Sequence, residues 1–321
     1  MYYSFQAMCQ QNISMISKVH LLGFHSPQSL NYGLFTILLH IYCLTLCGNL
    51  LMVILVTHIR ELHQPMYFFL TQLSIADVLL TTDVVPSLLH ILLNKIGVIS
   101  FAGCIAQFFI FAFSEGSECF LLTVMSYDRY LAICNPLHYT TIMTHKLCLQ
   151  LVIISWLLSF SLSVVETVST SSLQYCGPNT IDHFFCDLPL VLELSCSDTS
   201  GVNLEFVLIS APVLFCAFII IIMSYSYIIF VILEIPSSTG RQKAFSTCSS
   251  HLTVVSIFYG TLFGVYILPT KGQSLNIKKF LSLLYTVGTP LMNPVIYSLR
   301  NSHIIKAFRT FKHRFLHKIQ I

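Results

Sequence analysis

Seven apolar stretches, each long enough to cross a lipid bilayer, dominate the hydrophobic pattern of the chain. They lie near residues 31–57, 66–93, 103–130, 147–167, 203–233, 244–268 and 280–299. A transmembrane helix needs about 20 predominantly apolar residues, and more when it is tilted. The pattern therefore predicts an all-α membrane protein that folds as a single seven-transmembrane helix bundle, with no separate soluble domain.

The segment after the seventh stretch is amphipathic. Ile304, Phe308, Phe311 and Phe315 recur at spacings of four, three and four residues, with Lys and Arg between them. This spacing places the apolar side chains on one face of a helix. We expect a short amphipathic C-terminal helix that lies on the inner leaflet, in contact with membrane lipid.

The composition supports a membrane location. Hydrophobic residues make up 55% of the 321 residues, and charged residues only 9%. A soluble domain carries about 25% charged residues. So few charges cannot cover a water-exposed surface of this size, so most apolar side chains must face lipid or a core continuous with it.

The basic residues predict which end of the bundle faces the cytosol. With residues 1–30 extracellular and the tail 300–321 cytoplasmic, the inner side holds Arg60, Arg129, Lys146, Arg241, Lys243, Arg300, Lys306, Arg309, Lys312, Arg314 and Lys318. The outer side holds only Lys18, Lys95, Lys271, Lys278 and Lys279. This distribution obeys the positive-inside rule. We therefore expect a multi-pass plasma-membrane protein with this orientation, and no nucleic-acid partner for its basic tail.

The N-terminal residues agree with this orientation. Residues 1–30 contain no apolar core of a signal peptide, so the first span is expected to act as its own insertion signal. Asn12 begins the sequon Asn12-Ile13-Ser14, which is glycosylated only on the lumenal side. An outer N-terminus and an inner C-terminus require an odd number of spans, as the hydrophobic pattern predicts.

The cysteines of the predicted outer side suggest disulfides. They are Cys9, Cys104, Cys176, Cys186 and Cys196. The extracellular side is oxidising and permits bridges there. The spacing suggests two bridges with Cys9 left over, but it leaves the connectivity open. A zinc site that uses His183 beside Cys186 is an alternative.

Two carboxyl groups, Asp77 and Glu118, fall deep inside the second and third spans. No Lys or Arg lies in the core of any span to pair with them. Charged carboxylates are costly in a membrane, so the two must be protonated, share a proton, or hold a cation such as sodium. Asn49 and Asn293 are candidate oxygen donors for that cation. A protonated, hydrogen-bonded structural pair is the alternative.

Four motifs lie at the ends of the predicted spans. Leu62-His63-Gln64-Pro65-Met66-Tyr67-Phe68-Phe69-Leu70 opens the second, and Met125-Ser126-Tyr127-Asp128-Arg129-Tyr130-Leu131-Ala132-Ile133-Cys134 closes the third. Lys243-Ala244-Phe245-Ser246-Thr247-Cys248-Ser249-Ser250-His251-Leu252 opens the sixth, and Pro290-Leu291-Met292-Asn293-Pro294-Val295-Ile296-Tyr297 ends the seventh. Together they resemble the odorant-receptor family of rhodopsin-like G-protein-coupled receptors, from about Asn12 to Arg309.

The resemblance implies a receptor and not an enzyme. Its partners would be a small-molecule odorant and a heterotrimeric G protein of the stimulatory, olfactory type, which raises cyclic AMP. It implies no cofactor, apart from a sodium ion held by Asp77, Glu118, Asn49 and Asn293. It also favours the disulfide pairs Cys104–Cys186 and Cys176–Cys196.

An inner switch is a further implication. The resemblance assigns it to Asp128, Arg129, Tyr130, Tyr225, His251 and Tyr297. An arginine at the cytoplasmic end of a helix is held by a charge-assisted pair with a neighbouring aspartate, and its release makes a two-state switch. A simple membrane-edge anchor is the alternative. Pro294 removes a backbone hydrogen bond and permits a kink nearby.

The resemblance also places the ligand cavity between the outer halves of spans three, five, six and seven. The third span offers one helical stripe, Phe111, Ala112, Glu115, Gly116 and Cys119. The other spans offer Phe206, Ile209, Ser210, Val213, Tyr259, Leu262, Phe263, Tyr266, Leu283 and Thr286. This mostly apolar set with a few hydroxyls is typical of a small-molecule cavity. For each residue, packing against a neighbouring helix is the alternative.

Glu115 departs from the small or neutral residue that is expected at its position in this family. It lies one turn from Glu118 on the same helix face. Two hypotheses follow. Glu115 binds an amine or a strong hydrogen-bond donor of the ligand, or it is neutral and bonds a neighbouring side chain.

Other functions have less support. A retinal-binding pigment needs a Schiff-base lysine in the seventh span, and residues 280–299 contain none. We find neither the paired repeats of a transporter, nor a pore pattern, nor an acid placed to form a catalytic cluster with His251 and its serine neighbours. A receptor of the same fold for a pheromone or a peptide is the strongest rival.

Overall fold

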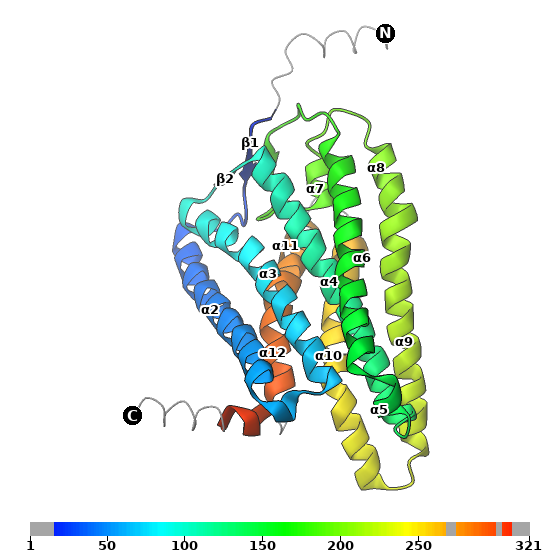
Figure 1. Ribbon diagram of the computed structural model, residues 1–321. Coiled ribbons are helices and arrows are strands. Elements are labelled where there is room, and N and C mark those ends of the chain that lie inside the picture. Colours follow the sequence, from blue (N-terminus) through cyan, green and yellow to red (C-terminus); the bar gives the residue numbers. More distant parts are fainter. Residues whose placement is uncertain (1–15, 268–273, 300–303, 310–321) are drawn as a thin grey trace.

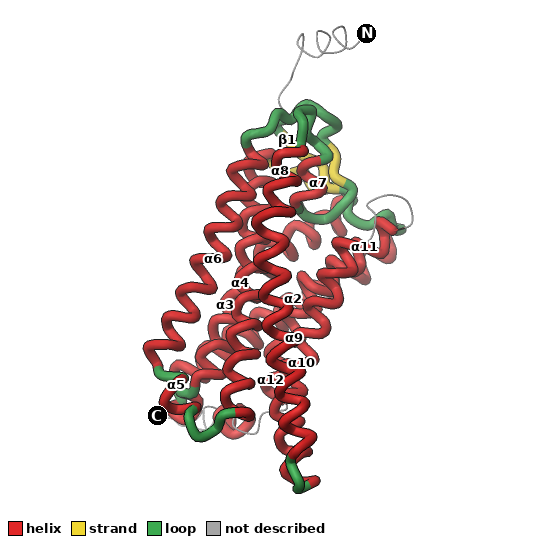
Figure 2. Tube along the Cα trace, turned by 90° about the vertical axis from the view of Figure 1, so that its right-hand side faces the viewer, coloured by secondary structure: helices red, strands yellow, loops and turns green. Residues whose placement is uncertain are grey.

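The computed structural model describes residues 16–267, 274–299 and 304–309. Its long helices lie side by side as a bundle, with a small sheet at one end and loops at both ends (Figures 1 and 2). Within the described residues, six spans are long and apolar enough to cross a membrane. They are α2 (Gln28–His58), α3 (Pro65–Asn94), α4 (Phe101–Cys134), α6 (His145–Ser171), the run Ser200–Glu234, and the Cys248–Val265 part of α10 (Ser238–Ile267).

The seventh crossing is made of three consecutive helical segments. They are α11 (Ser274–Leu283), the π-helical turn η3 (Leu284–Gly288) and α12 (Thr289–Leu299). This crossing begins six residues before the range 280–299 expected from hydropathy. The helix also includes polar residues such as Lys278 and Lys279, which a hydropathy criterion leaves out. The chain is therefore a seven-helix membrane bundle.

The fifth crossing also contains a π-helical turn. It consists of α8 (Ser200–Glu205), the π turn η2 (Phe206–Ser210) and α9 (Ala211–Glu234). Such turns insert one extra residue into a helix and frequently occur at functional sites. Here the turn carries Phe206, Ile209 and Ser210, three residues of the candidate ligand set.

Short elements lie at both ends of the bundle. Figure 1 shows α7 (Leu188–Leu192) at the end where α8 begins. At the opposite end it shows α5 (Tyr139–Ile142) and the turn from α9 to α10. A 3₁₀ turn, η1 (Arg60–Leu62), joins α2 to α3, and residues 304–309 are helical.

The predicted amphipathic tail is described only at its start. Ile304 is 2% exposed, and with Phe308 it lines a groove against α2 and α12. Phe311 and Phe315 lie outside the described residues. The apolar face of the first turn therefore packs partly against the bundle.

A three-stranded sheet was not anticipated from the hydrophobic pattern. Its order is β2-β1-β3, formed by β1 (Lys18–Leu21), β2 (Gly97–Ser100) and β3 (Thr180–Ile181). β1 runs antiparallel to β2 and parallel to β3. Val19 and Leu21 of β1 point into the outer apolar cluster and are at most 1% exposed. The sheet thereby fastens the segment before α2 to two outer loops.

Local sequence explains several helix starts. The Ser100 hydroxyl accepts the amide of Gly103 at 3.0 Å, and the Thr144 hydroxyl accepts that of Leu147 at 3.3 Å. Both residues cap free backbone donors of the first turn. Pro65 occupies the first position of α3, where its missing N–H has no cost.

The interior consists of two apolar clusters, one in each half of the bundle. The inner cluster includes Leu121, Met125 and Ile221, and the outer one includes Phe108 and Phe185. The outward faces are also apolar: in α9, Ile222 and Phe230 are among many large exposed hydrophobic side chains. These faces match a lipid environment.

Candidate functional site

A cavity lies among α4, α6, the η2–α9 run and α10, with the loop before α7 over it. It holds about 50 Å³ of open space, and eight of the expected ligand residues line it: Phe111, Ala112, Glu115, Gly116, Cys119, Phe206, Ser210 and Leu262. A cavity of this size fits a few heavy atoms. The α4 stripe expected from sequence therefore faces one common cavity, together with parts of two other helices.

Nine further residues line the cavity, and sequence reasoning missed them: Phe108, Ser159, Leu162, Ser163, Glu166, Asp187, Leu188, Leu214 and Phe258. The sequence contains a pattern from which the α6 side of the cavity could have been predicted. Ser155, Ser159, Ser163 and Glu166 recur at helical spacing within an otherwise apolar span, and all are at most 9% exposed. A polar stripe on one face of a membrane helix predicts that this face points inward.

The other expected ligand residues whose side chains the structure describes lie outside this cavity. Ile209 is 44% exposed on the lipid-facing side, because the cavity side of the π turn is taken by Phe206 and Ser210. Val213 lines a different, shallower groove, which is formed by α4, α6 and α9. The Tyr259 hydroxyl contacts Cys119 Sγ at 2.8 Å, and Phe263 packs against Phe218.

The two expected residues of the seventh crossing also pack elsewhere. Leu283 packs against the outer apolar cluster. Thr286 is fully buried, and its hydroxyl donates to the Ser282 carbonyl at 2.7 Å. The side chain of Tyr266 lies outside the described residues. The described lining thus comes from α4, α6, the start of α7, the η2–α9 run and α10, and the seventh crossing contributes none of it.

Three carboxyl groups line this cavity. Glu115 of α4 is close enough to Asp187 and Glu166 to interact electrostatically with both. Asp187 accepts the amide of Leu188 at 2.7 Å, as the cap of α7. Burial raises the pKa of Asp187 to about 6, while this amide and Lys278 act in the opposite direction. Among the described residues, no Lys, Arg or His lines the cavity.

A second polar group lies in the centre of the bundle. Asn293 Nδ2 donates to both carboxylate oxygens of Asp77, at 2.9 and 3.0 Å, and Glu118 lies beside Asp77. Asn49 Nδ2 donates to the carbonyl of Pro290 at 3.0 Å, which fastens α2 to the helix that carries Asn293. Asn49, Asp77, Glu118 and Asn293 are at most 3% exposed.

Several oxygens of this central group have no hydrogen-bond partner among the described residues. They are Asn49 Oδ1, Glu118 Oε1, Glu118 Oε2 and Asn293 Oδ1. Buried oxygens of this kind need a donor or a cation. Carboxylate and amide oxygens are also the ligands that hard cations prefer. The donor set therefore fits a small hard cation, as well as a shared-proton pair.

At the inner end, the expected switch residues cluster around Arg129. Arg129 Nε and Nη2 donate to Asp128 Oδ2 at 3.0 and 2.5 Å, and the Tyr139 hydroxyl donates to Asp128 Oδ1 at 2.7 Å. Burial is the largest cause that raises the pKa of Tyr139, so its hydroxyl stays a donor. The Asp128 carboxylate is fully buried, so this pair holds the guanidinium against its own helix.

The aromatic switch residues surround this pair. The hydroxyl of Tyr225 is hydrogen-bonded to His251 Nδ1, and their rings stack at 5.6 Å. Tyr297 is 5% exposed, and its hydroxyl has no partner among the described residues. Tyr130 meets the ring of Tyr227 edge-on, on the side of α9. Helices α4, α9, α10 and α12 thus converge at the inner end.

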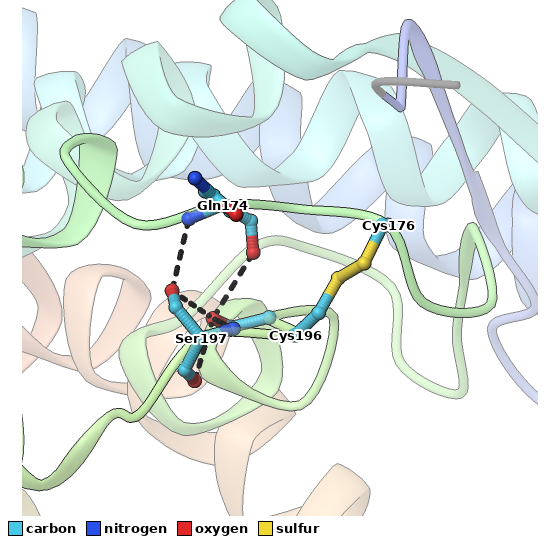
Figure 3. The surroundings of a disulfide bond; sticks show 5 residues. Gln174, Cys176, Cys196 and Ser197 are labelled. Carbon is cyan, nitrogen blue, oxygen red and sulfur yellow. Dashed lines mark hydrogen bonds between the residues drawn. A yellow bond between two sulfur atoms is a disulfide. The ribbon is translucent and has the colours of Figure 1, made fainter. Parts of the chain in front are cut away.

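The outer end is fastened by two disulfides. Cys104 and Cys186 are joined with Cα atoms 5.5 Å apart, and Cys176 and Cys196 with Cα atoms 5.7 Å apart. These are the two pairs expected from the resemblance. Figure 3 shows the second, where the Cys196 amide donates to the Gln174 carbonyl at 2.9 Å. Cys9 and the sequon residue Asn12 lie outside the described residues.

A buried lysine adds a third fastening. Lys279 Nζ donates to the Gly23 carbonyl at 2.7 Å and to Asp182 Oδ1 at 2.6 Å, and its side chain is fully buried. His183, the zinc-ligand alternative, is 4% exposed and packs against the rings of Phe184 and Phe185. Burial lowers the pKa of His183 to about 3, so it is uncharged at neutral pH.

Comparisons with known proteins agree on one family. The family model described as "Olfactory receptor" matches residues 38–317. The human olfactory receptor 10A7 is 44% identical over 98% of this chain and 100% of its own length. The mouse olfactory receptor 5G25 is 47% identical over 98% of this chain and 99% of its own.

A solved structure supports the fold. The crystal structure of squid rhodopsin matches with a TM-score of 0.67 at 18% sequence identity, covering 91% of this chain and 88% of that one. At this identity the likeness concerns the fold alone, and it agrees with the seven helices described above. The family match over most of the chain and the close relatives lead to one conclusion: the chain belongs to the olfactory receptor family, a family of membrane receptors and not of enzymes.

Proposed function

We propose that this receptor binds a small, mostly apolar odorant in the outer cavity and activates a heterotrimeric G protein of the stimulatory, olfactory type, raising cyclic AMP. One observation carries the proposal. Helix α4 lines the cavity with residues from Phe108 to Cys119, and the same helix carries the Asp128–Arg129 pair at its inner end. A ligand that shifts α4 can therefore act directly on the inner switch.

The inner switch works by exchange of partners. In the described arrangement Arg129 is occupied by Asp128, which Tyr139 also holds. Rotation of α4 or displacement of α5 weakens this contact and frees the guanidinium for the G protein. Tyr225 and Tyr297 line the space beside it and are positioned to steady the released arginine.

We propose a plasma-membrane location with the sheet and both disulfides outside. The excess of basic residues at the other end supports this orientation through the positive-inside rule. Disulfides also persist in an oxidising compartment. Glycosylation at Asn12 belongs to the same proposal.

A sodium ion at the centre of the bundle is a further part of the proposal. Asp77, Glu118 and the side-chain oxygens of Asn49 and Asn293 would hold it. The unpaired oxygens of this group support the idea. Because a ligand that binds only the folded state stabilises it, NaCl is expected to raise the Tm of the purified receptor above its value in an equal concentration of choline chloride. Asp77→Asn should remove that difference, and an equal sodium effect in the variant would exclude this site.

The experiment that tests the proposed function is a cyclic-AMP reporter assay in cells that express the receptor with an N-terminal epitope tag. Surface staining of unpermeabilised cells shows whether the receptor is present and whether its N-terminus is outside. We expect at least one compound in a panel of short alcohols, acids, esters and amines to raise cyclic AMP. Arg129→Ala should lose the response with unchanged staining. A receptor that is stained at the surface but inert to the whole panel would contradict the proposal.

A further inference from the structure

The outer cavity gathers carboxyl groups from three separate elements. Glu115 comes from α4, Glu166 from α6 and Asp187 from the loop before α7. The remaining lining consists of apolar side chains, three serine hydroxyls, one cysteine and one glycine. With no basic residue among the described lining, nothing in the cavity wall balances these acids.

Glu115 has an unsatisfied acceptor in this cavity. Its Oε1 atom is buried and has no hydrogen-bond partner among the described residues. The other two acids have donors: the Ser210 hydroxyl lies beside Glu166, and the Leu188 amide donates to Asp187. A buried acceptor without a partner is unfavourable, so a ligand that brings a donor to Glu115 gains that hydrogen bond. This disfavours the hypothesis that Glu115 bonds a neighbouring side chain.

The electrostatics of the cavity favour a positive ligand. Glu115, Glu166 and Asp187 repel one another when charged, and a cation between them turns repulsion into attraction. Asp187 is ionised at pH 7.4, because its pKa lies near 6. Lys278 of α11 interacts electrostatically with Asp187, but it does not line the cavity.

The apolar part of the wall decides which kind of cation fits. Phe108, Phe111, Leu162, Leu214 and Leu262 offer no oxygen ligands. A bare metal ion of the calcium type needs six to eight oxygens around it. An organic cation instead presents its ammonium group to the acids and its alkyl part to these side chains.

We propose that the cavity binds a short alkyl amine in its ammonium form, with the ammonium group donating to Glu115, and Glu166 and Asp187 supplying further negative charge. This rests on the proposed function, since it names the ligand class of that same cavity. The open space of about 50 Å³ favours a short chain.

The test measures ligand binding without signalling. The purified full-length receptor is heated at pH 7.4 with equal concentrations of n-butylamine, butan-1-ol or butanoate, which all have four carbon atoms and carry different polar groups. Because a ligand of the folded state raises its Tm, we expect a shift with n-butylamine at least threefold larger than with the alcohol or the acid. Glu115→Gln keeps the size of the side chain and removes the carboxyl group that can ionise beside an ammonium group, and it should abolish most of that shift.

Matched variants separate binding from folding. Glu193→Gln makes the same chemical change at an exposed loop position outside the cavity and should keep the full shift. If Glu115→Gln does not yield folded receptor, Glu166→Gln and Asp187→Asn take its place, and each should reduce the shift. An equal shift with butan-1-ol, no shift with n-butylamine, n-hexylamine or 1,4-diaminobutane, or a full shift in the cavity variants would overturn the proposal.

Failure of the amine proposal can be distinguished from failure of the proposed signalling function. If alcohols or esters raise cyclic AMP while amines neither signal nor shift the Tm, the receptor function stands and the amine inference fails. If amines shift the Tm but no compound in the panel raises cyclic AMP, the ligand class stands and the signalling proposal fails.

Discussion

His183 illustrates how the outer end of the bundle holds a titratable residue in one protonation state. Its ring packs against the rings of Phe184 and Phe185, and its carbonyl accepts the amide of Gly23. Lys278 and Lys279 lie near enough to disfavour a positive charge on the His183 ring. Asp182 raises the pKa of His183, but burial has the largest effect and lowers it. The residue therefore packs as a neutral aromatic side chain.

This burial predicts a sensitivity to acid. The pKa of His183 is about 3 when folded and near 6.5 when unfolded, so below pH 6.5 the unfolded chain binds more protons and stability falls. The loss reaches about 2 kcal/mol at pH 5. In His183→Phe, the fall in Tm between pH 7.5 and pH 5.0 should therefore be smaller than in the wild type.

The control is an exposed histidine, since His90→Phe should keep the full acid-induced fall. Asp187 acts in the opposite sense, because its raised pKa adds stability as the pH falls, but it does so equally in all three proteins. An identical fall in wild type and His183→Phe would show that His183 is not the sensor.

At the scale of elements, the contact between α4 and α6 shapes the cavity. Ser159 Oγ donates to the Phe113 carbonyl at 2.7 Å, directly opposite Gly116. A Cβ at position 116 would lie 2.6 Å from Ser159 Oγ. Gly116 therefore lets α4 and α6 approach closely, and it leaves this part of the cavity wall without a side chain.

Gly116→Ala should consequently make the receptor less stable than the same substitution at a helix position with open space around it. Alanine favours a helix by about 1 kcal/mol over glycine, but here it displaces the Ser159 hydroxyl and sacrifices a hydrogen bond worth about 1 kcal/mol. Gly260→Ala is the matched control, because nothing lies within 4 Å of its added Cβ. We expect a lower Tm for Gly116→Ala than for Gly260→Ala, and equal values would refute the tight contact.

The elements also show how far sequence reasoning reaches. Long apolar runs predicted the helices, because a membrane leaves the backbone few alternatives. The strands of two to four residues were missed, since such short segments have no recognisable hydrophobic period. The α4 stripe was predicted from helical spacing, but hydropathy does not reveal a π turn, so Ile209 was expected inside and lies on the lipid side. Asp187 was missed because a loop has no periodicity that would point it inward.

At the scale of the whole molecule, the two ends have different constructions. The outer end is fixed by two disulfides, a small sheet and the Lys279–Asp182 contact. The inner end is held by hydrogen bonds and packing around Arg129. Covalent links hold a cavity in shape, whereas a few hydrogen bonds can exchange partners. This asymmetry suits a receptor that recognises a ligand at one end and changes at the other.

The most direct test of this account blocks the cavity and reads the inner end. Ala112→Phe adds a phenyl ring to the α4 wall of a cavity with about 50 Å³ of open space. Cyclic AMP is then measured against the most active panel compound in cells matched for surface staining. The account predicts that Ala112→Phe loses the response while its staining stays at the wild-type level. A wild-type dose–response curve in Ala112→Phe would contradict it, because the ligand would then act from another place.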